Sequence, residues 1–417
     1  MFSKAICERI FSFLGPSVLQ RPFRVVFADG TKYQNYDGSK NPEIEIVFKN
    51  AKGQRRLILE GYVGFFESYI NGDIDLNGEN PVHSLTRLGL ESGLMRKHAI
   101  PNPILLLKQF WWERKVSNRS WERARLNALT HYNLPGEFFR IVLGKTYGYC
   151  EGYYRHGYDG DDDQAQHDRF DHVCKKLLLK PGDKLVEVGS GWGYMSVLAA
   201  EKYGAEVVNY GIVPEQNAVL ERMIKEKGLE GRARVVDRDH RALMEEPEKY
   251  DKYVSLGVYE HAGRWELEDW IKSISVGLKK GGIGVLASMF KMDDSYTAYL
   301  TTRYIFPGGY LPSLPRTLEL MDTYNLHVLD AENLWHHYQR AVQYWAKNFR
   351  ENWKAIHALD PKRFDERFRR IWTMYLEGCG EAFSEDWARL NVFHLTFTKG
   401  RHPDYYPATR DFLYTNS

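Results

Sequence analysis

A short apolar run followed by closely spaced glycines is the most chemically informative part of the chain. Residues 184–188 read Lys-Leu-Val-Glu-Val, and Gly189, Gly191 and Gly193 follow. The apolar run is typical of a buried strand, and the glycines allow a sharp turn whose main-chain N–H groups can approach a ligand. We predict a strand and a nucleotide-binding loop here, although the same pattern also occurs in purely structural turns.

The spacing of these glycines and their neighbours select among nucleotides. The last spacing is shorter than in a dinucleotide fingerprint, and Trp192 lies inside the turn, so a pyrophosphate is not the expected ligand. Glu187 offers a carboxylate at the end of the predicted strand, which suits a cationic ligand that carries an amino acid. S-adenosylmethionine has this character. The predicted cofactor is therefore S-adenosylmethionine.

The elements that must position this loop follow along the chain. Further strands are predicted at 206–211, 234–237, 253–257 and 282–287, with helical stretches between them. This alternation indicates an α/β fold with a mostly parallel sheet covered on both faces, as in a Rossmann-like class I methyltransferase with seven strands. Residues 391–398 alternate apolar and polar positions, and we expect them to close the edge of the sheet.

Composition sets the limits for partners and compartment. The chain has 417 residues, 43% of them hydrophobic, and its 57 basic and 55 acidic residues leave a net charge of +2, which gives no nucleic-acid signature. The four cysteines are scattered, and no cysteine or histidine spacing indicates a metal site. Charged residues interrupt residues 1–19, so we expect neither a signal peptide nor a membrane span there, and a cytoplasmic protein.

The N-terminal part has a different texture. Residues 24–33 contain a turn signal after an apolar run, residues 43–59 are predicted as a β-hairpin, and charge-rich helical segments are expected from about 81 to 126. We therefore predict a small α+β domain with a helical linker at 1–125, and a catalytic domain at 126–417. The apolar run 104–112 precedes a basic stretch, which favours either contact with an anionic bilayer or a solvated helix packed on a neighbour.

Five motifs in a fixed order carry a family resemblance. They lie at 149–154, 186–193, 214–216, 254–263 and 303–313. Together they resemble cyclopropane-fatty-acyl-phospholipid synthases and the related mycolic-acid methyltransferases. The resemblance covers roughly 131–353 and is fainter at 67–75, which is similar to the family's lipid-binding domain. It implies S-adenosylmethionine as the cofactor, the double bond of an unsaturated acyl chain, usually in a phospholipid, as the acceptor, and a peripheral position on the inner face of the membrane.

The resemblance also implies a set of cofactor contacts. Glu187, Gly189 and Gly191 would line the methionine end, and Gln216 would meet the ribose. Either Gln216 or His240 could instead be an ordinary surface or loop residue. The other expected contacts, around the adenine and in the wall of the site, are Asp239, His240, Arg241, Tyr149 and Trp192.

The chemistry that this family performs needs a dry site. An isolated alkene is a poor nucleophile, so the methyl group must be held at near-attack distance, and transfer leaves a carbocation that aromatic faces can stabilise. Any single aromatic side chain in this set is as readily explained by core packing. The candidates are Tyr149, Tyr153, Tyr259, Tyr304, Phe306 and Tyr338.

A base must then remove a proton. In the synthases that this chain resembles, a bicarbonate ion does so, held by Cys, His, Glu and Tyr side chains. The Glu matches Glu260 and the Tyr matches Tyr338, whereas Glu151 stands at the Cys position and Ala287 at the His position. Our hypothesis is that Glu151 is the general base. The alternative is that Glu151 is a surface loop residue and bicarbonate binds elsewhere.

The altered site bears on the product and the partners. Loss of two bicarbonate ligands favours a methylene- or methyl-branched chain over a cyclopropane, and a methylene product would call for a partner reductase. A homo-oligomer is compatible with the sequence. Two other classes are considered: a methyltransferase for a small soluble isoprenoid or natural product, which would need no lipid, and a non-catalytic lipid-binding protein, which would not bind S-adenosylmethionine.

Overall fold

The computed structural model describes residues 2–13, 21–38, 41–91, 102–384 and 390–414, which form two compact units. The first contains Met1–Lys115 and Trp345–Ala388, and the second contains Val116–Tyr344 and Arg389–Ser417. Parts of two predicted segments, residues 14–20 and 92–101, lie outside the described residues. Within the described part, no helix combines the length and the apolar character needed to span a bilayer.

The first unit is built on a four-stranded sheet of order β2-β1-β3-β4. β1 pairs antiparallel with β2 across the predicted turn and parallel with β3, and alternate residues of β1 and β3 are buried in the core. Its strands are β1 (Phe23–Val26), β2 (Lys32–Gln34), β3 (Ile44–Phe48) and β4 (Ile74–Asn77). Its helices are α1 (Phe2–Phe13), α2 (Ala51–Ile70), α3 (Pro81–Glu91), nearly all of α5 (Pro103–Val116), α15 (Trp353–Leu359), α16 (Glu366–Ala382) and the end of α14 (Trp335–Glu351).

The predicted hairpin at 43–59 is wrong. β3 is followed at once by α2, because Asn50 caps the helix by accepting hydrogen bonds from the backbone N–H groups of Lys52 and Gly53. Apolar side chains near the end of this segment had been read as a second strand. They lie in a helix, because β4 rather than these residues supplies the antiparallel partner of β3.

The boundary between the two units also differs from the expected division at residue 125. Residues 345–388 belong to the first unit, where Arg370 donates hydrogen bonds to the carbonyl oxygens of Tyr69 (2.8 Å) and Ile74 (2.9 Å). Glu377 accepts hydrogen bonds from the N–H groups of Val82 and His83 at the start of α3. These long-range contacts join a C-terminal segment to the N-terminal unit, which local sequence patterns do not reveal.

The second unit contains a seven-stranded sheet of order β10-β11-β9-β8-β5-β6-β7. All strands run parallel except β11, which is antiparallel to both neighbours. The class I methyltransferase fold predicted from the sequence is confirmed. The strands are β5 (Lys184–Val188), β6 (Glu206–Tyr210), β7 (Ala233–Val236), β8 (Tyr250–Leu256), β9 (Leu278–Phe290), β10 (Leu326–Asn333) and β11 (Asn391–Lys399).

The position expected for residues 391–398 needs correction. They form β11, but β11 lies between β9 and β10 and is not an edge strand. The edge is β10, which the sequence did not predict, because its residues are mostly half-buried and polar residues interrupt its apolar pattern.

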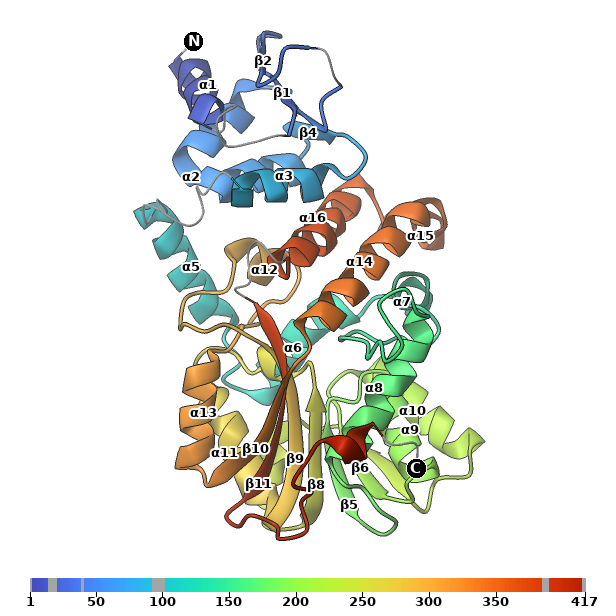
Figure 1. Ribbon diagram of the computed structural model, residues 1–417. Coiled ribbons are helices and arrows are strands. Elements are labelled where there is room, and N and C mark those ends of the chain that lie inside the picture. Colours follow the sequence, from blue (N-terminus) through green and yellow to red (C-terminus); the bar gives the residue numbers. More distant parts are fainter. Residues whose placement is uncertain (1, 14–20, 39–40, 92–101, 385–389, 415–417) are drawn as a thin grey trace. The chain divides into compact units, whose positions relative to one another are not determined.

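Helices cover both faces of this sheet. Figure 1 shows α8, α9 and α10 on one side and α11 and α13 on the other, and each side encloses its own apolar core. The helices of this unit are α6 (Trp121–Tyr132), α7 (Gly136–Leu143), α8 (Asp162–Lys176), α9 (Tyr194–Glu201), α10 (Pro214–Glu226), α11 (Leu267–Gly277), α12 (Tyr299–Tyr304), α13 (Leu314–Thr323) and most of α14. The short 3-10 helices are η1 (His240–Glu245), η2 (Tyr259–His261) and η3 (Asp411–Leu413).

Candidate active site

The glycine loop between β5 and α9 has the conformation that its sequence predicts. Gly189, Gly191 and Gly193 all have positive φ angles, of 77°, 54° and 91°, which side chains with a Cβ rarely adopt. A Cβ on Gly189 would lie 2.7 Å from Val258, and one on Gly193 would lie 2.6 Å from Leu220. A Cβ on Gly191 would meet no atom within 4 Å. The outer glycines thus allow close packing, and Gly191 keeps the middle of the loop open.

Glu187 is buried in the last turn of chain before this loop. Its carboxylate accepts a hydrogen bond from the Ser196 hydroxyl on α9, and burial raises its pKa to about 7. A buried carboxyl group with a raised pKa binds a cation favourably, because the cation stabilises the ionised form. These residues therefore fit the amino-acid end of S-adenosylmethionine, with Glu187 and the loop holding it.

A cavity opens above the carboxyl ends of β5, β6 and β8, where ligands bind in open α/β sheets. Every residue predicted to contact the cofactor lines this cavity. They are Tyr149, Glu187, Gly189, Gly191, Trp192, Gln216, Asp239, His240 and Arg241. Their contacts with the cofactor itself stay predictions.

The predicted adenine contacts form a rigid wall. Asp239 caps η1 by accepting a hydrogen bond from the Arg241 N–H, and its other oxygen lies 2.7 Å from the Arg241 guanidinium. The His240 ring is stacked on Trp270 at 4.1 Å and contacts the Ser273 hydroxyl through Nδ1. Burial lowers the pKa of His240 well below its ordinary value, so this wall presents a neutral imidazole.

Aromatic rings line another part of the cavity. Tyr149 is stacked on His131 and lies 3.1 Å from it through its hydroxyl group, and the His131 ring lies 4.3 Å from Phe306. Two more rings in the wall, Tyr132 and His261, are joined by a 3.0 Å hydrogen bond. Of the aromatic residues that the sequence predicted, Tyr149 lines the cavity and Phe306 lies behind it.

Two of the other predicted aromatic residues lie elsewhere. Tyr259 is buried against Trp270 and Phe290 in the core on the α11 side of the sheet. Tyr153 is stacked between His172 and His337, with ring centroids 4.0 Å and 5.2 Å apart. Core packing therefore accounts for Tyr259, and Tyr153 belongs to a buried polar cluster.

The segment that carries Glu151 is fixed to α8. The Gln166 side chain donates a hydrogen bond to the Cys150 carbonyl, and the Tyr153 N–H donates to the Ala165 carbonyl at 2.7 Å. A Cβ on Gly152 would lie 2.9 Å from the Ala165 side chain, so glycine is needed for this close approach. The segment is therefore held in one position beside the helix.

Glu151 is buried and surrounded by cationic and N–H groups. Its Oε1 atom lies 2.6 Å from His394 Nε2 and 3.9 Å from Arg169 Nη1. Although burial opposes ionisation, the hydrogen bond and the charge of these partners lower the pKa of Glu151 below its ordinary value. The alternative that Glu151 is a surface loop residue is wrong, because only 2% of it is exposed.

Glu260 is buried near Glu151 but has different partners. Its Oε1 atom accepts a hydrogen bond from the Met289 N–H at 2.6 Å, whereas Oε2 makes no hydrogen bond with any described residue. Burial raises the pKa of Glu260 to about 7, and the Glu151 charge adds to this rise. Tyr338 is buried near the start of α14. The catalytic roles of all three stay predictions.

Cys150 does not take the place of the cysteine that the family uses for bicarbonate. Its Sγ atom lies 3.4 Å from the Leu256 carbonyl, and burial raises its pKa to about 12. The thiol therefore stays protonated at neutral pH and is directed toward the end of β8.

Sequence patterns missed two residues of this site, His394 and Arg169. His394 lies in the alternating run that forms β11, and Arg169 lies on α8 among other charged residues. The one available signal was that both residues interrupt the apolar face of an element expected to be buried. Glu151, which is far from His394 in sequence, gave no indication of the contact.

The fold, the glycine loop and the acidic residue at the end of β5 define an S-adenosylmethionine-dependent methyltransferase. The model of one family, described as mycolic acid cyclopropane synthetase, matches residues 119–393. The chain belongs to this family. It is thus an enzyme of the class that modifies fatty acyl chains by S-adenosylmethionine-dependent methyl transfer or cyclopropane formation.

Individual relatives agree with this assignment. A probable fatty acid methyltransferase of Pseudomonas putida is 27% identical over 95% of this chain and 97% of its own length. The cyclopropane-fatty-acyl-phospholipid synthase of Escherichia coli K12 is also 27% identical, over 87% of this chain and 90% of its own. A solved mycolic acid cyclopropane synthase complexed with SAH and CTAB covers 66% of this chain and 98% of its own, with 26% identity and a TM-score of 0.60.

Proposed function

We propose that this enzyme methylates the double bond of an unsaturated acyl chain in a phospholipid, and that Glu151 removes a proton from the resulting carbocation. The observation that carries the proposal is a buried carboxylate held ionised by His394 and Arg169 beside the cavity. The family and the synthase of Escherichia coli support a fatty acyl substrate.

The cavity wall would bind and orient the donor. S-adenosylmethionine supplies an electrophilic methyl group when it is bound. Glu187 and the glycine loop would hold its amino-acid end, and Gln216 with the Asp239 region would hold the nucleoside. The apolar and aromatic residues around Tyr149 would exclude water, which would otherwise trap a carbocation.

The aromatic wall would also stabilise the positive charge. Ring faces attract cations without forming a covalent bond, so Tyr149 and Tyr132 can lower the energy of the cation and still release it. The pKa of Tyr132 is raised above its ordinary value by burial, which keeps its phenol protonated and non-nucleophilic.

Glu151 would complete the reaction as a general base. A C–H bond next to the cationic carbon breaks, its electron pair forms a new carbon–carbon bond or double bond, and the proton passes to the carboxylate. Because the base is a side chain, no bicarbonate ion is required. We further propose an acyclic product, since the groups that would hold bicarbonate are replaced at residues 151 and 287. If that product is a methylene chain, a partner reductase would finish it.

The experiment combines one substitution with an isotopic label. Glu151→Gln should bind S-adenosylmethionine with unchanged affinity but lose turnover by roughly 10²- to 10⁴-fold, the usual contribution of a general base. Normal turnover in this variant would refute the proposed base. With a trideuterated methyl donor, mass spectrometry of the lipids separates the products: a methyl-branched alkene keeps three deuteriums, whereas a cyclopropane or methylene chain keeps two.

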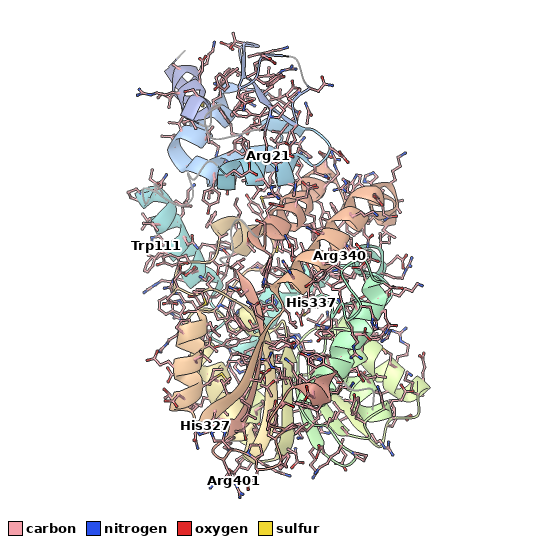
Figure 2. All side chains as sticks on the ribbon, viewed as in Figure 1. Arg21, Trp111, His327, His337, Arg340 and Arg401 are labelled. Carbon is pink, nitrogen blue, oxygen red and sulfur yellow. The ribbon has the colours of Figure 1, made fainter. Side chains whose placement is uncertain are left out.

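Access to phospholipid requires contact with a membrane, and α5 offers a surface for it. Four of its apolar side chains are exposed, and Trp111 is the most exposed at 63% (Figure 2). Basic residues occupy the last turn of the helix, as expected for binding to anionic headgroups. The exposed apolar residues of α5 are Ile104, Leu106, Leu107 and Trp111.

We therefore propose a peripheral position on the inner, cytoplasmic face of the membrane. Trp111→Glu should weaken sedimentation with anionic vesicles by about tenfold, because a charge replaces a buried indole at the bilayer surface. Trp265→Glu is the matched control, since Trp265 is similarly exposed at 55% but lies outside α5. Equal binding by both variants would exclude α5 as the membrane contact.

A further inference from the structure

His394 lies in a row of residues that crosses three strands of the sheet. On β11 it pairs with Ala287 of β9 on one side and with Glu332 of β10 on the other. Residues directly opposite one another on neighbouring strands point to the same face of a sheet. The imidazole therefore lies level with Ala287, one strand away from the position at which the family would have a histidine.

Helix α8 covers this row with cationic side chains. Arg169, His172 and Lys176 share one face of the helix because they are three and four residues apart. His172 Nε2 lies 2.8 Å and Lys176 Nζ lies 2.7 Å from the Glu332 carboxylate, and both side chains are fully buried. The cluster thus places a buried ammonium group and its counter-ion next to His394.

The protonation state of His394 follows from these surroundings. Burial, and next the Lys176 charge, lower the pKa of the imidazole, although Glu151 acts in the opposite direction. Since Glu151 is ionised and can only accept, a neutral imidazole must donate Nε2–H across the 2.6 Å contact. Its Nδ1 atom makes no hydrogen bond with any residue that the structure describes. The titratable groups around the ring are Glu151, Arg169, His172, Lys176, Asp330, Glu332 and His337.

We propose that His394 is the positioning residue of the base, and that its neutral imidazole donates a hydrogen bond to Glu151 Oε1 and leaves Oε2 for the substrate proton. This inference rests on the proposed function of Glu151. The donor fixes the rotamer of the carboxylate and keeps it ionised in a buried site. The role that bicarbonate ligands perform in the relatives is thereby taken by a side-chain pair assembled from the 150–153 segment and β11.

Two substitutions test the role of the donor. His394→Leu removes the N–H group, so kcat should fall by about 10- to 100-fold while the KM for S-adenosylmethionine stays unchanged. The acid limb of the kcat profile should move to higher pH, because the pKa of Glu151 rises when it loses a donor. His394→Gln retains an N–H group near the position of Nε2 and should recover most of the rate. An unchanged pH profile in His394→Leu, or no recovery in His394→Gln while the fold is intact, would overturn the proposal.

A spectroscopic measurement separates this inference from the proposed function. In the wild-type protein, ¹⁵N NMR should find His394 as the neutral Nε2–H tautomer between pH 6 and 8. A protonated ring or the other tautomer would overturn the positioning role, whatever the activity of Glu151→Gln. If Glu151→Gln is fully active but the tautomer is as expected, the base assignment fails and the hydrogen bond is structural only.

Discussion

Glu151 and Glu260 are two buried glutamates in one part of the second unit, and their surroundings give them opposite pKa shifts. Glu151 faces an imidazole N–H and a guanidinium, which lower its pKa despite burial. Glu260 receives a single main-chain N–H group at Oε1, and burial raises its pKa to about 7. Each carboxyl group also affects the other, because the Glu151 charge disfavours ionisation of Glu260.

The difference teaches how one residue type can serve two purposes in a dry site. A carboxyl group that must accept a proton needs a low enough pKa to be ionised at the start of each turnover. A neighbour that is close to half protonated at neutral pH can donate or accept a hydrogen bond without adding a full second negative charge. The two environments therefore favour Glu151 as the base and a supporting role for Glu260.

The sharpest test of this comparison exchanges each carboxyl group for an amide. Glu151→Gln should lower kcat by roughly 10²- to 10⁴-fold, whereas Glu260→Gln should lower it by only about tenfold, because an amide oxygen can still accept the Met289 N–H. Single-turnover kinetics with S-adenosylmethionine and a monounsaturated phospholipid would measure both. Equal losses would mean that the two groups act together, for instance in binding bicarbonate, and the comparison would fail.

A second test uses the dependence of stability on pH. The pKa of Glu260 rises from an ordinary 4.5 to about 7 in the folded state, so between these values the folded protein retains a proton that the unfolded chain has lost. The free energy of unfolding should therefore be highest below pH 4.5 for this group and fall as the pH rises to 7, by about 3 kcal/mol.

Glu260→Gln removes that part of the slope, which urea unfolding at pH 5 and pH 8 would detect. Glu187 has the same raised pKa and should retain its own contribution in this variant. A slope identical to that of the wild type would show that Glu260 is ionised in the folded protein at neutral pH.

The smallest expected effect concerns the guanidinium beside Glu151. Arg169→Gln should raise the pKa of Glu151 and move the acid limb of the kcat profile upward by about one pH unit, since a nearby positive charge is lost. Arg155→Gln is the matched control, because Arg155 also lies beside α8 but faces Asp171 at 4.0 Å. If both variants shift the profile equally, the shift reflects total charge rather than contact with Glu151.

Local sequence patterns predicted the cofactor side of the site well. The strand at 184–188, the glycine loop and the strands of β6 to β9 were found because each is specified by a few consecutive residues. The cofactor contacts carried over from the family also line one cavity. Glycines at Gly189 and Gly193 are required by backbone angles and close packing, so the signal in the sequence has a direct physical cause.

The base side could be predicted only in part, because it is assembled from distant segments. The substitution at residue 151 was visible, but its partner His394 depends on how β11 inserts between β9 and β10. That insertion was not predicted, since β10 has a weak apolar pattern. The hairpin expected at 43–59 failed for a related reason: short apolar runs do not distinguish strand from helix until the pairing partner is known.

The division of the chain into units has a consequence for biosynthesis. Arg370 and Glu377 complete the first unit by binding backbone groups of residues 69–83, yet they are translated after nearly all of the catalytic unit. On the ribosome, the emerging N-terminal segment must wait for these partners, exposing its unfinished core while the second unit folds. A chaperone that holds this segment would therefore matter more to the yield of active enzyme than the stability of the catalytic unit itself.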